Sequence, residues 1–122
     1  MPFREYCKSK IHGAVVTEAN LHYAGSITID QRLLKLADLR PWEKVQVVNL
    51  NNGRRLETYI IPGRAGSGVI CLNGPAARCG CVGDRVHVIS YHLLAEEEKV
   101  RPPVVLKVDE RNRPLKTRRS KA

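Results

Sequence analysis

Residues 45–61 read VQVVNLNNGRRLETYII, in which two apolar segments that alternate with polar residues flank the dipeptide Asn52-Gly53. An alternation with a period of two is typical of a half-buried β-strand, because successive side chains point to opposite faces. Asn-Gly is a strong hairpin signal, since both residues tolerate the positive φ of a type I′ turn. We therefore expect residues 45–47 and 56–61 to form the two strands of a β-hairpin.

Short apolar runs continue this pattern on both sides of the hairpin. Further strands are expected at residues 11–17, 26–29, 69–72, 85–91 and 104–108. A short helix is expected from the N-cap candidate Asp30 through Ala37, and a further helical turn at residues 96–99. A mainly β chain of short strands with one or two short helices predicts a small closed barrel, because closure removes exposed sheet edges.

The composition predicts one small domain. The chain has 122 residues, of which 43% are hydrophobic and 5% aromatic, so its core must consist mainly of Val, Ile, Leu and Ala. No apolar run approaches the ~20 residues of a membrane helix. The charged N-terminus does not resemble a secretory signal. We therefore expect a cytoplasmic protein with no membrane partner.

The net charge of +9 is unevenly distributed. Residues 99–122 contain nine of the 21 Lys and Arg residues and two of the 12 acids, so they carry +7 and residues 1–98 carry +2. We expect a barrel domain at 1–98 and a basic C-terminal strand and tail at 99–122. A tail of this kind is most often a solvated, poorly ordered end, and less often it binds a polyanion. A nucleic-acid-binding barrel is the alternative to an enzyme. It is not favoured, because the body is nearly neutral and lacks an aromatic stripe or a basic helix.

The four cysteines do not have the spacing of a metal site. They are Cys7, Cys71, Cys79 and Cys81. Tetrahedral zinc sites usually use paired C-x2-4-C segments, whereas the C-x-C here has no second pair at a matching distance. We expect no metal, and we expect reduced, buried thiols.

The dipeptide Gly25-Ser26 lies between residues 21–23 and the expected strand at 26–29. A peptide bond is normally protected by resonance, but a bent backbone would allow the Ser26 hydroxyl to attack the Gly25 carbonyl and form an ester. Elimination from that ester leaves dehydroalanine, which hydrolyses to a pyruvoyl group, and the chain is cut after Gly25. Gly-Ser alone does not specify this chemistry, because Gly66-Ser67 occurs in a Gly-rich loop.

The residues around Gly25-Ser26 resemble those of a known family. The matching segments are Lys10-Ile11-His12, 16–17, 21–26, 29–30, 52–55, 58–59, 64–68, 73–77 and 82–84. In this order and spacing they resemble the pyruvoyl-dependent aspartate 1-decarboxylases over roughly residues 4–91, and several motifs in register are more specific than any one of them.

The resemblance implies a double-psi β-barrel that cleaves itself into a β chain, 1–25, and an α chain, 26–122. Ser26 becomes a covalent pyruvoyl cofactor that forms a Schiff base with L-aspartate. Loss of carbon dioxide then yields β-alanine for pantothenate (coenzyme A) biosynthesis. The resemblance also implies a homotetramer with active sites between subunits. It leaves open whether cleavage is spontaneous or requires a maturation factor.

The resemblance also implies roles for individual residues. Tyr59 is the expected proton donor. Arg55 and Lys10 are expected to hold the side-chain carboxylate, because a grip on the departing carboxylate would oppose the reaction. Thr58 is expected to contact the substrate and to polarise the Gly25 carbonyl. In an ideal strand, however, Thr58 faces away from Arg55 and Tyr59, and a bulge would be needed to turn it.

The remaining expected site residues belong to one pocket segment and to two isolated positions. The segment is Asn73, Gly74, Pro75 and Ala76, in which Pro75 replaces a small residue and has no N–H to donate. His12 and Tyr23 match positions near the processed end and the pocket, with no chemical step assigned to them. Ordinary packing, turn or surface roles are the alternatives for each of these residues taken alone.

Overall fold

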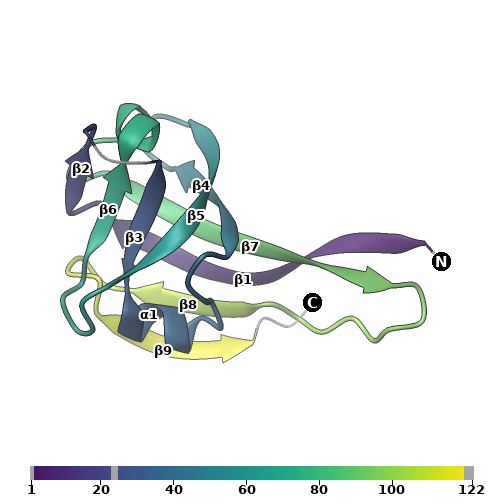
Figure 1. Ribbon diagram of the computed structural model, residues 1–122. Helices are drawn as coiled ribbons and strands as arrows, with labels where there is room; N and C mark the ends of the chain where they lie inside the picture. Colours follow the sequence, from purple (N-terminus) through teal and green to yellow (C-terminus); the bar gives the residue numbers. More distant parts are fainter. Residues whose placement is uncertain (1, 23–24, 120–122) are drawn as a thin grey trace.

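The computed structural model describes residues 2–22 and 25–119 (Figure 1). The described residues form nine strands and two short helices. In chain order these are β1 Phe3–Val15, β2 Glu18–Asn20, β3 Ser26–Asp30, α1 Gln31–Leu36, β4 Lys44–Asn49, β5 Arg55–Gly63, β6 Ile70–Asn73, the 3-10 helix η1 Gly74–Arg78, β7 Arg85–Ala95, β8 Val104–Val108 and β9 Pro114–Arg119. The expected mainly β fold is confirmed.

The strands form one sheet in the order β2-β6-β3-β5-β4-β7-β1-β8-β9. Within the described residues the hydrogen-bonded ladder ends at β2 and β9, and the strands wrap around one core as in a small barrel (Figure 1). The core is aliphatic, as expected, and its largest fully buried side chains include Ile11, Ile27, Ile60, Leu72 and Leu106. β3 pairs with β5, and β1 with β8, in parallel fashion. Strands that are far apart in the sequence are therefore neighbours in the sheet.

The β4–β5 hairpin is confirmed, but its expected type I′ turn is wrong. The strands pair from Lys44 opposite Tyr59 to Val48 opposite Arg55. Gly53 has φ +75°, whereas Asn52 is not among the residues with positive φ. The loop is longer than a two-residue turn because Asn49 organises it: its carbonyl accepts the Gly53 N–H at 2.9 Å.

Helix α1 begins where the sequence predicts. The Asp30 carboxylate caps it by accepting the Arg32 N–H at 2.8 Å, and it also accepts the N–H groups of Gly66 and Gly68. The helix expected at residues 96–99 is wrong, because that segment forms a non-helical turn and bend. The second short helix is η1. No helix in the part of the chain that the structure describes is long and apolar enough to cross a membrane.

β1 and β7 are longer than expected and form an arm that projects from the barrel (Figure 1). They pair in antiparallel fashion from Phe3 opposite Ala95 to Val15 opposite Arg85. The register shifts between Cys7 and Ser9, where β1 carries one additional residue. Residues 3–10 do not alternate between apolar and polar side chains, so a periodicity analysis does not detect this strand. Its hydrogen bonds come from the long-range partner β7.

The basic C-terminal segment forms strands of the sheet as far as Arg119, while the side chains of Lys99, Arg101, Lys107, Arg111 and Arg113 are exposed to solvent. β8 confirms the predicted strand at 104–108, and β9 pairs with it in antiparallel fashion. Asn112, in the turn between them, is 2% exposed. Its amide bonds the N–H and C=O of Val15 at 2.7 and 2.8 Å and the C=O of Gly68 at 2.8 Å. These bonds attach the β8–β9 turn to the barrel.

The four cysteines are free thiols, as expected. Cys71 is buried, while Cys7 and Cys79 are half-buried. The expectation of buried thiols is wrong for Cys81, which is exposed. Cys81 precedes a surface turn, and its backbone N–H donates to the Asp84 carboxylate.

Candidate active site

Ser26 is the first residue of β3 and is fully buried. β3 lies between β6 and β5, with Ser26 opposite Asn73 and Ile27 beside Ile60. Tyr59 precedes Ile60 as Ser26 precedes Ile27, so the parallel register places Ser26 level with Tyr59. Since Ile27 and Ile60 both point into the core, Ser26 and Tyr59 share the opposite face of the sheet.

The Asn73 side chain holds the Ser26 hydroxyl. Its Nδ2 donates to Ser26 Oγ and to Thr28 Oγ1, each at 2.9 Å, and its Oδ1 accepts from Cys71 Sγ at 3.1 Å. Burial, and then the Glu18 carboxylate, raise the pKa of the Cys71 thiol, so it remains a neutral donor. Asn73 is itself 3% exposed. The Ser26 oxygen therefore has a fixed position in a site with little access for water.

A cavity of about 380 Å³ adjoins this site. The lining residues come from the segment before β3, from β5 and from the η1 region: Gly25, Leu56, Glu57, Thr58, Tyr59, Pro75, Ala76 and Cys79. Gly25 and Pro75 are neighbours, because a Cβ built on Gly25 would lie 3.5 Å from Pro75 Cδ. The cavity thus brings together the expected cleavage site, the expected proton donor, Thr58 and part of the segment 73–76.

The segment 73–76 turns sharply from β6 into η1. Gly74 has φ +64°, a conformation that a residue with a side chain rarely adopts. Pro75 lies in the first turn of η1, where a missing N–H is tolerated. At the other end, the C=O of Cys79 accepts from Asn49 Nδ2 at 3.1 Å and Asn52 Nδ2 at 3.0 Å. The β4–β5 hairpin therefore holds η1 against the cavity.

Thr58 reaches the cavity without a bulge. The pairing of β4 with β5 shows no register shift, so Thr58 faces the opposite side of β5 from Arg55 and Tyr59. It still lines the cavity together with Leu56. The cavity therefore lies where both faces of β5 contribute to one wall.

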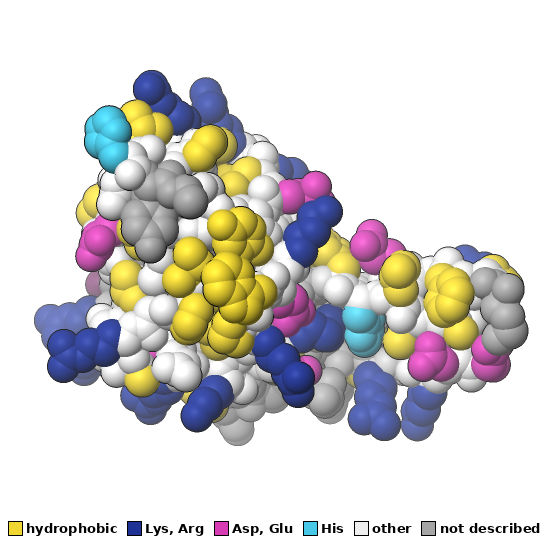
Figure 2. Space-filling view, in the orientation of Figure 1, with side chains coloured by type: hydrophobic (Ala, Val, Ile, Leu, Met, Phe, Trp, Pro, Cys, Tyr) yellow, Lys and Arg dark blue, Asp and Glu magenta, His cyan; other side chains and the backbone are white. Residues whose placement is uncertain are grey.

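Three contacts at the site were not predicted from the sequence. Thr28 shares the Asn73 amide with Ser26, and its place two residues after Ser26 is the signal that would have found it. Cys71 bonds the other end of that amide. Trp42 stacks on Tyr59 with ring centroids 5.8 Å apart. No local pattern predicts this stacking, since 16 residues lie between Trp42 and Tyr59 in the sequence. Hydrophobic side chains gather on this side of the barrel (Figure 2).

Arg55 and Lys10 do not meet within one chain. Arg55 is in β5 and Lys10 in β1, and β4 and β7 lie between them. Three strand spacings separate them by roughly 14 Å along the sheet. Lys10 does not line the cavity, and neither does His12. Arg55 is not among the lining residues either, although it directly precedes the lining residue Leu56 in β5.

His12 stacks on His87, with ring centroids 4.2 Å apart. His87 Nδ1 accepts the Gly13 N–H at 3.1 Å. Burial, then Lys10 and His12, lower the pKa of His87 to about 4. Burial, then Lys10 and Lys107, also lower the pKa of His12, so both rings are neutral at pH 7. The other isolated expectation, Tyr23, lies outside the described residues.

Comparison with known proteins gives one family over nearly the whole chain. The family model described as aspartate decarboxylase matches residues 2–115. The chain belongs to the aspartate decarboxylase family. It is similar to proteins named aspartate 1-decarboxylase: 59% identical to that of Kosmotoga olearia over 113 residues (93% of this chain, 97% of the relative), and 58% to that of Desulfitobacterium hafniense strain DCB-2 over 115 (93% and 91%). That of Leptospira biflexa strain Ames is 56% identical over 112 residues (90% and 95%).

The aspartate decarboxylase match includes Gly25, Ser26 and every residue that lines the cavity. A pyruvoyl group made from Ser26 would occupy the start of β3, next to the Asn73 amide and level with Tyr59. The residues present fit such a group, because the buried Asn73 amide lies opposite the start of β3 and a cavity of about 380 Å³ adjoins it.

Proposed function

We propose that this protein is an aspartate 1-decarboxylase that converts L-aspartate to β-alanine and carbon dioxide, a product used for pantothenate biosynthesis, and that its pyruvoyl cofactor is formed from Ser26. The observation that carries the proposal is the arrangement of Ser26, Asn73 and Tyr59 beside the cavity that Gly25 lines. The nucleic-acid-binding alternative is not favoured, because the family match extends to residue 115 and includes much of the basic segment.

Maturation begins at the Ser26 hydroxyl. Attack on the Gly25 carbonyl carbon replaces the amide bond with an ester and frees the Ser26 amine. Elimination releases the Gly25 carboxylate and leaves dehydroalanine, and water then converts dehydroalanine to the ketone with release of ammonia. Asn73 holds the attacking oxygen in place, and Thr58, which lines the same cavity as Gly25, polarises the Gly25 carbonyl. The products are a β chain, 1–25, and an α chain, 26–122.

Decarboxylation requires an electron sink, and the pyruvoyl carbonyl supplies it. The chain's own residues bind the substrate and move the proton. The Tyr59 phenol, level with position 26, donates a proton to the α-carbon once carbon dioxide has left. Arg55 shares a face of β5 with Tyr59 and holds the carboxylate that is retained, since its fork fits a carboxylate.

A homotetramer with sites between subunits accounts for the separation of Arg55 from Lys10. Within one chain the two cations lie three strands apart, and neither lines the cavity. A second copy that brings its Lys10 to the cavity of the first would add the second expected cation there, accompanied by the neutral ring of His12.

Intact mass and activity test the proposal together. Purified wild-type protein is expected to contain fragments 1–25 and 26–122, the larger one blocked to Edman degradation, and to release β-alanine from L-aspartate. Ser26→Ala should remain whole and inactive. Ser67→Ala is the matched control, because Gly66-Ser67 is also a Gly-Ser pair, and it should be cut and active. Activity from an uncut chain would overturn the cofactor assignment. Cleavage of the purified protein alone would show that no maturation factor is needed.

A further inference from the structure

Trp42 combines a strained backbone with an exposed ring. Its φ is +73°, a region that bulky residues rarely adopt, and the residue is 70% exposed. Both features cost free energy, because the backbone is strained and a large apolar surface remains in water. Strain at such a residue is typical of functional sites. Here the indole stacks on the Tyr59 ring at 5.8 Å, with 22° between the planes.

The loop that carries Trp42 is bonded to β5 immediately after Tyr59. The Trp42 N–H donates to the C=O of Ile60 at 2.8 Å, and the Ile60 N–H donates to the C=O of Glu43 at 3.1 Å. These two bonds hold the backbone of Trp42 and Glu43 against the residue that follows Tyr59. The backbone that carries the indole is therefore fixed beside β5, where the indole stacks on the phenol ring.

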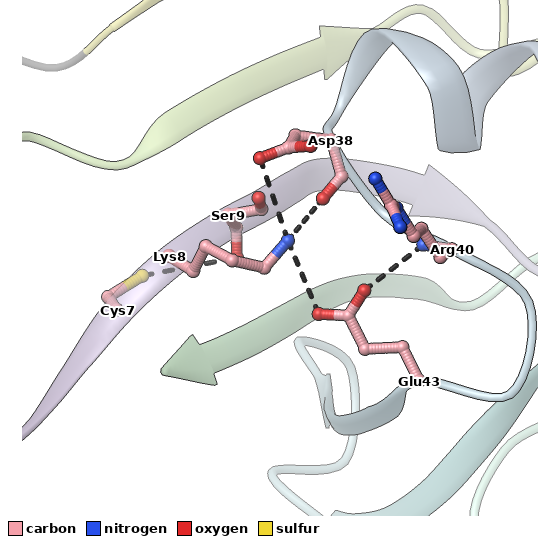
Figure 3. Close-up of polar contacts among 6 residues, drawn as sticks. All are labelled: Cys7, Lys8, Ser9, Asp38, Arg40 and Glu43. Carbon is pink, nitrogen blue, oxygen red and sulfur yellow. Dashed lines mark hydrogen bonds and ion pairs between the residues drawn. The ribbon is translucent and has the colours of Figure 1, made fainter. Parts of the chain in front are cut away.

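Lys8 of β1 ties the two ends of this loop together (Figure 3). Its Nζ lies 3.3 Å from Glu43 Oε2 and 3.8 Å from Asp38 Oδ2, and it also donates to the C=O of Asp38. The other Glu43 oxygen accepts the Arg40 N–H at 3.0 Å. Lys8 is the additional residue at the register shift of β1, and a bulge of this kind redirects a side chain. The side chains of Lys8 and Glu43 are 20% and 23% exposed, so this pair is shielded more than a surface ion pair.

We propose that Trp42 is a positioning residue that holds the Tyr59 phenol toward position 26, and that Lys8 holds the loop from which Trp42 acts. This inference rests on the proposed function, in which Tyr59 is the proton donor. Proton transfer depends steeply on the placement of the donor. Loss of the indole therefore lowers kcat, while KM changes little because Trp42 is not among the residues that line the cavity.

The test compares three substitutions of Trp42 in protein that intact mass shows to be fully cleaved. Trp42→Gly removes the ring and also relieves the strain at φ +73°, so its thermal midpoint should equal or exceed that of the wild type. Its kcat should fall at least tenfold, with KM within twofold of the wild type. Trp42→Phe retains a flat ring and should remain within threefold in kcat. Trp42→Leu retains apolar bulk without a ring, and its kcat and KM should match those of Trp42→Gly. If Trp42→Gly does not accumulate, Trp42→Leu takes its place in the test.

Lys8 has its own matched pair of variants. Lys8→Met retains the length of the side chain and removes its charge, and kcat should fall severalfold with cleavage unchanged. Lys35→Met, in an exposed position on α1, makes the same change away from this loop and should have wild-type kinetics. Wild-type kcat in both ring-deleting Trp42 variants, or a rise in KM alone, would overturn the positioning role and leave the proposed function intact. A wild-type protein that releases no carbon dioxide from aspartate would instead refute the proposed function.

Discussion

Asn73 lies directly across the β3–β6 pair from Ser26, and its Nδ2 is 2.9 Å from Ser26 Oγ in a buried site. The same amide hydrogen-bonds Thr28 and Cys71, so its orientation is set from both ends. This contact depends on the fold, because the pairing of β3 with β6 places the Asn73 amide on the Ser26 hydroxyl.

Substitution of Asn73 should slow self-cleavage. In Asn73→Ala the Ser26 oxygen loses a donor worth roughly 1–2 kcal/mol, which corresponds to about a tenfold slower reaction. The measurement is the uncut fraction against time by intact mass. Gln31→Ala, an exposed amide at the start of α1, is the control and should be cut at the wild-type rate. A wild-type rate in Asn73→Ala would exclude a role for this amide in maturation.

Arg55→Ala should impair aspartate turnover without preventing cleavage. Loss of a bidentate partner for the retained carboxylate should lower kcat/KM by about 100-fold, and Arg55→Lys should recover only part of it because the planar fork is lost. Steady-state release of β-alanine from cleaved protein measures the effect. Arg54→Ala removes the neighbouring exposed arginine and should have nearly wild-type kinetics. Equal effects at both positions would point to general surface charge.

The stability of the protein should fall as the pH decreases from about 6.5 toward 4. The folded pKa of His87 is about 4, below its ordinary value of 6.5, because of burial, Lys10 and His12. The unfolded chain therefore binds more protons in this window, and stability rises with pH there, by at most about 1.4 kcal/mol per pH unit for this one group. The lowered pKa of His12 acts in the same direction.

Chemical denaturation of the wild type and His87→Gln at several pH values tests this expectation. The variant should lose part of the pH dependence between 4 and 6.5 and match the wild-type slope above pH 7. Identical slopes in the acidic window would show that His87 titrates as it does in the unfolded chain.

Asn112→Gly should destabilise the protein although glycine suits the φ of +60° at this position. The substitution removes three hydrogen bonds of a buried side chain, which predicts a loss of about 2–4 kcal/mol in the free energy of unfolding. Urea denaturation provides the value. Glu110→Ala, at an exposed position in the same turn, should remain within ~0.5 kcal/mol of the wild type. If the free energy of unfolding of Asn112→Gly equals that of the wild type, the C-terminal segment does not contribute to stability through Asn112.

Local patterns predicted the parts of the fold that depend on nearest neighbours along the chain. The β4–β5 hairpin follows from alternation around Asn52-Gly53, and the start of α1 follows from the capping carboxylate of Asp30. Gly25-Ser26 and the segment 73–76 were identified by motifs in register, and in the structure Gly25, Pro75 and Ala76 line one cavity with Tyr59.

Long-range pairing determined the rest. The outer half of β1 and all of β9 are polar or basic segments whose strand conformation depends on partners that their own periodicity does not reveal. The order of the strands in the sheet places Lys10 three strands away from Arg55. The hydrogen bonds between β5 and the loop before β4 bring Trp42 onto Tyr59. The sequence by itself therefore determined the class of fold and the family, and it identified Gly25-Ser26 as the candidate cleavage site. Which side chains surround that dipeptide was decided by tertiary structure, because strand order and curvature set distances between residues that are far apart along the chain.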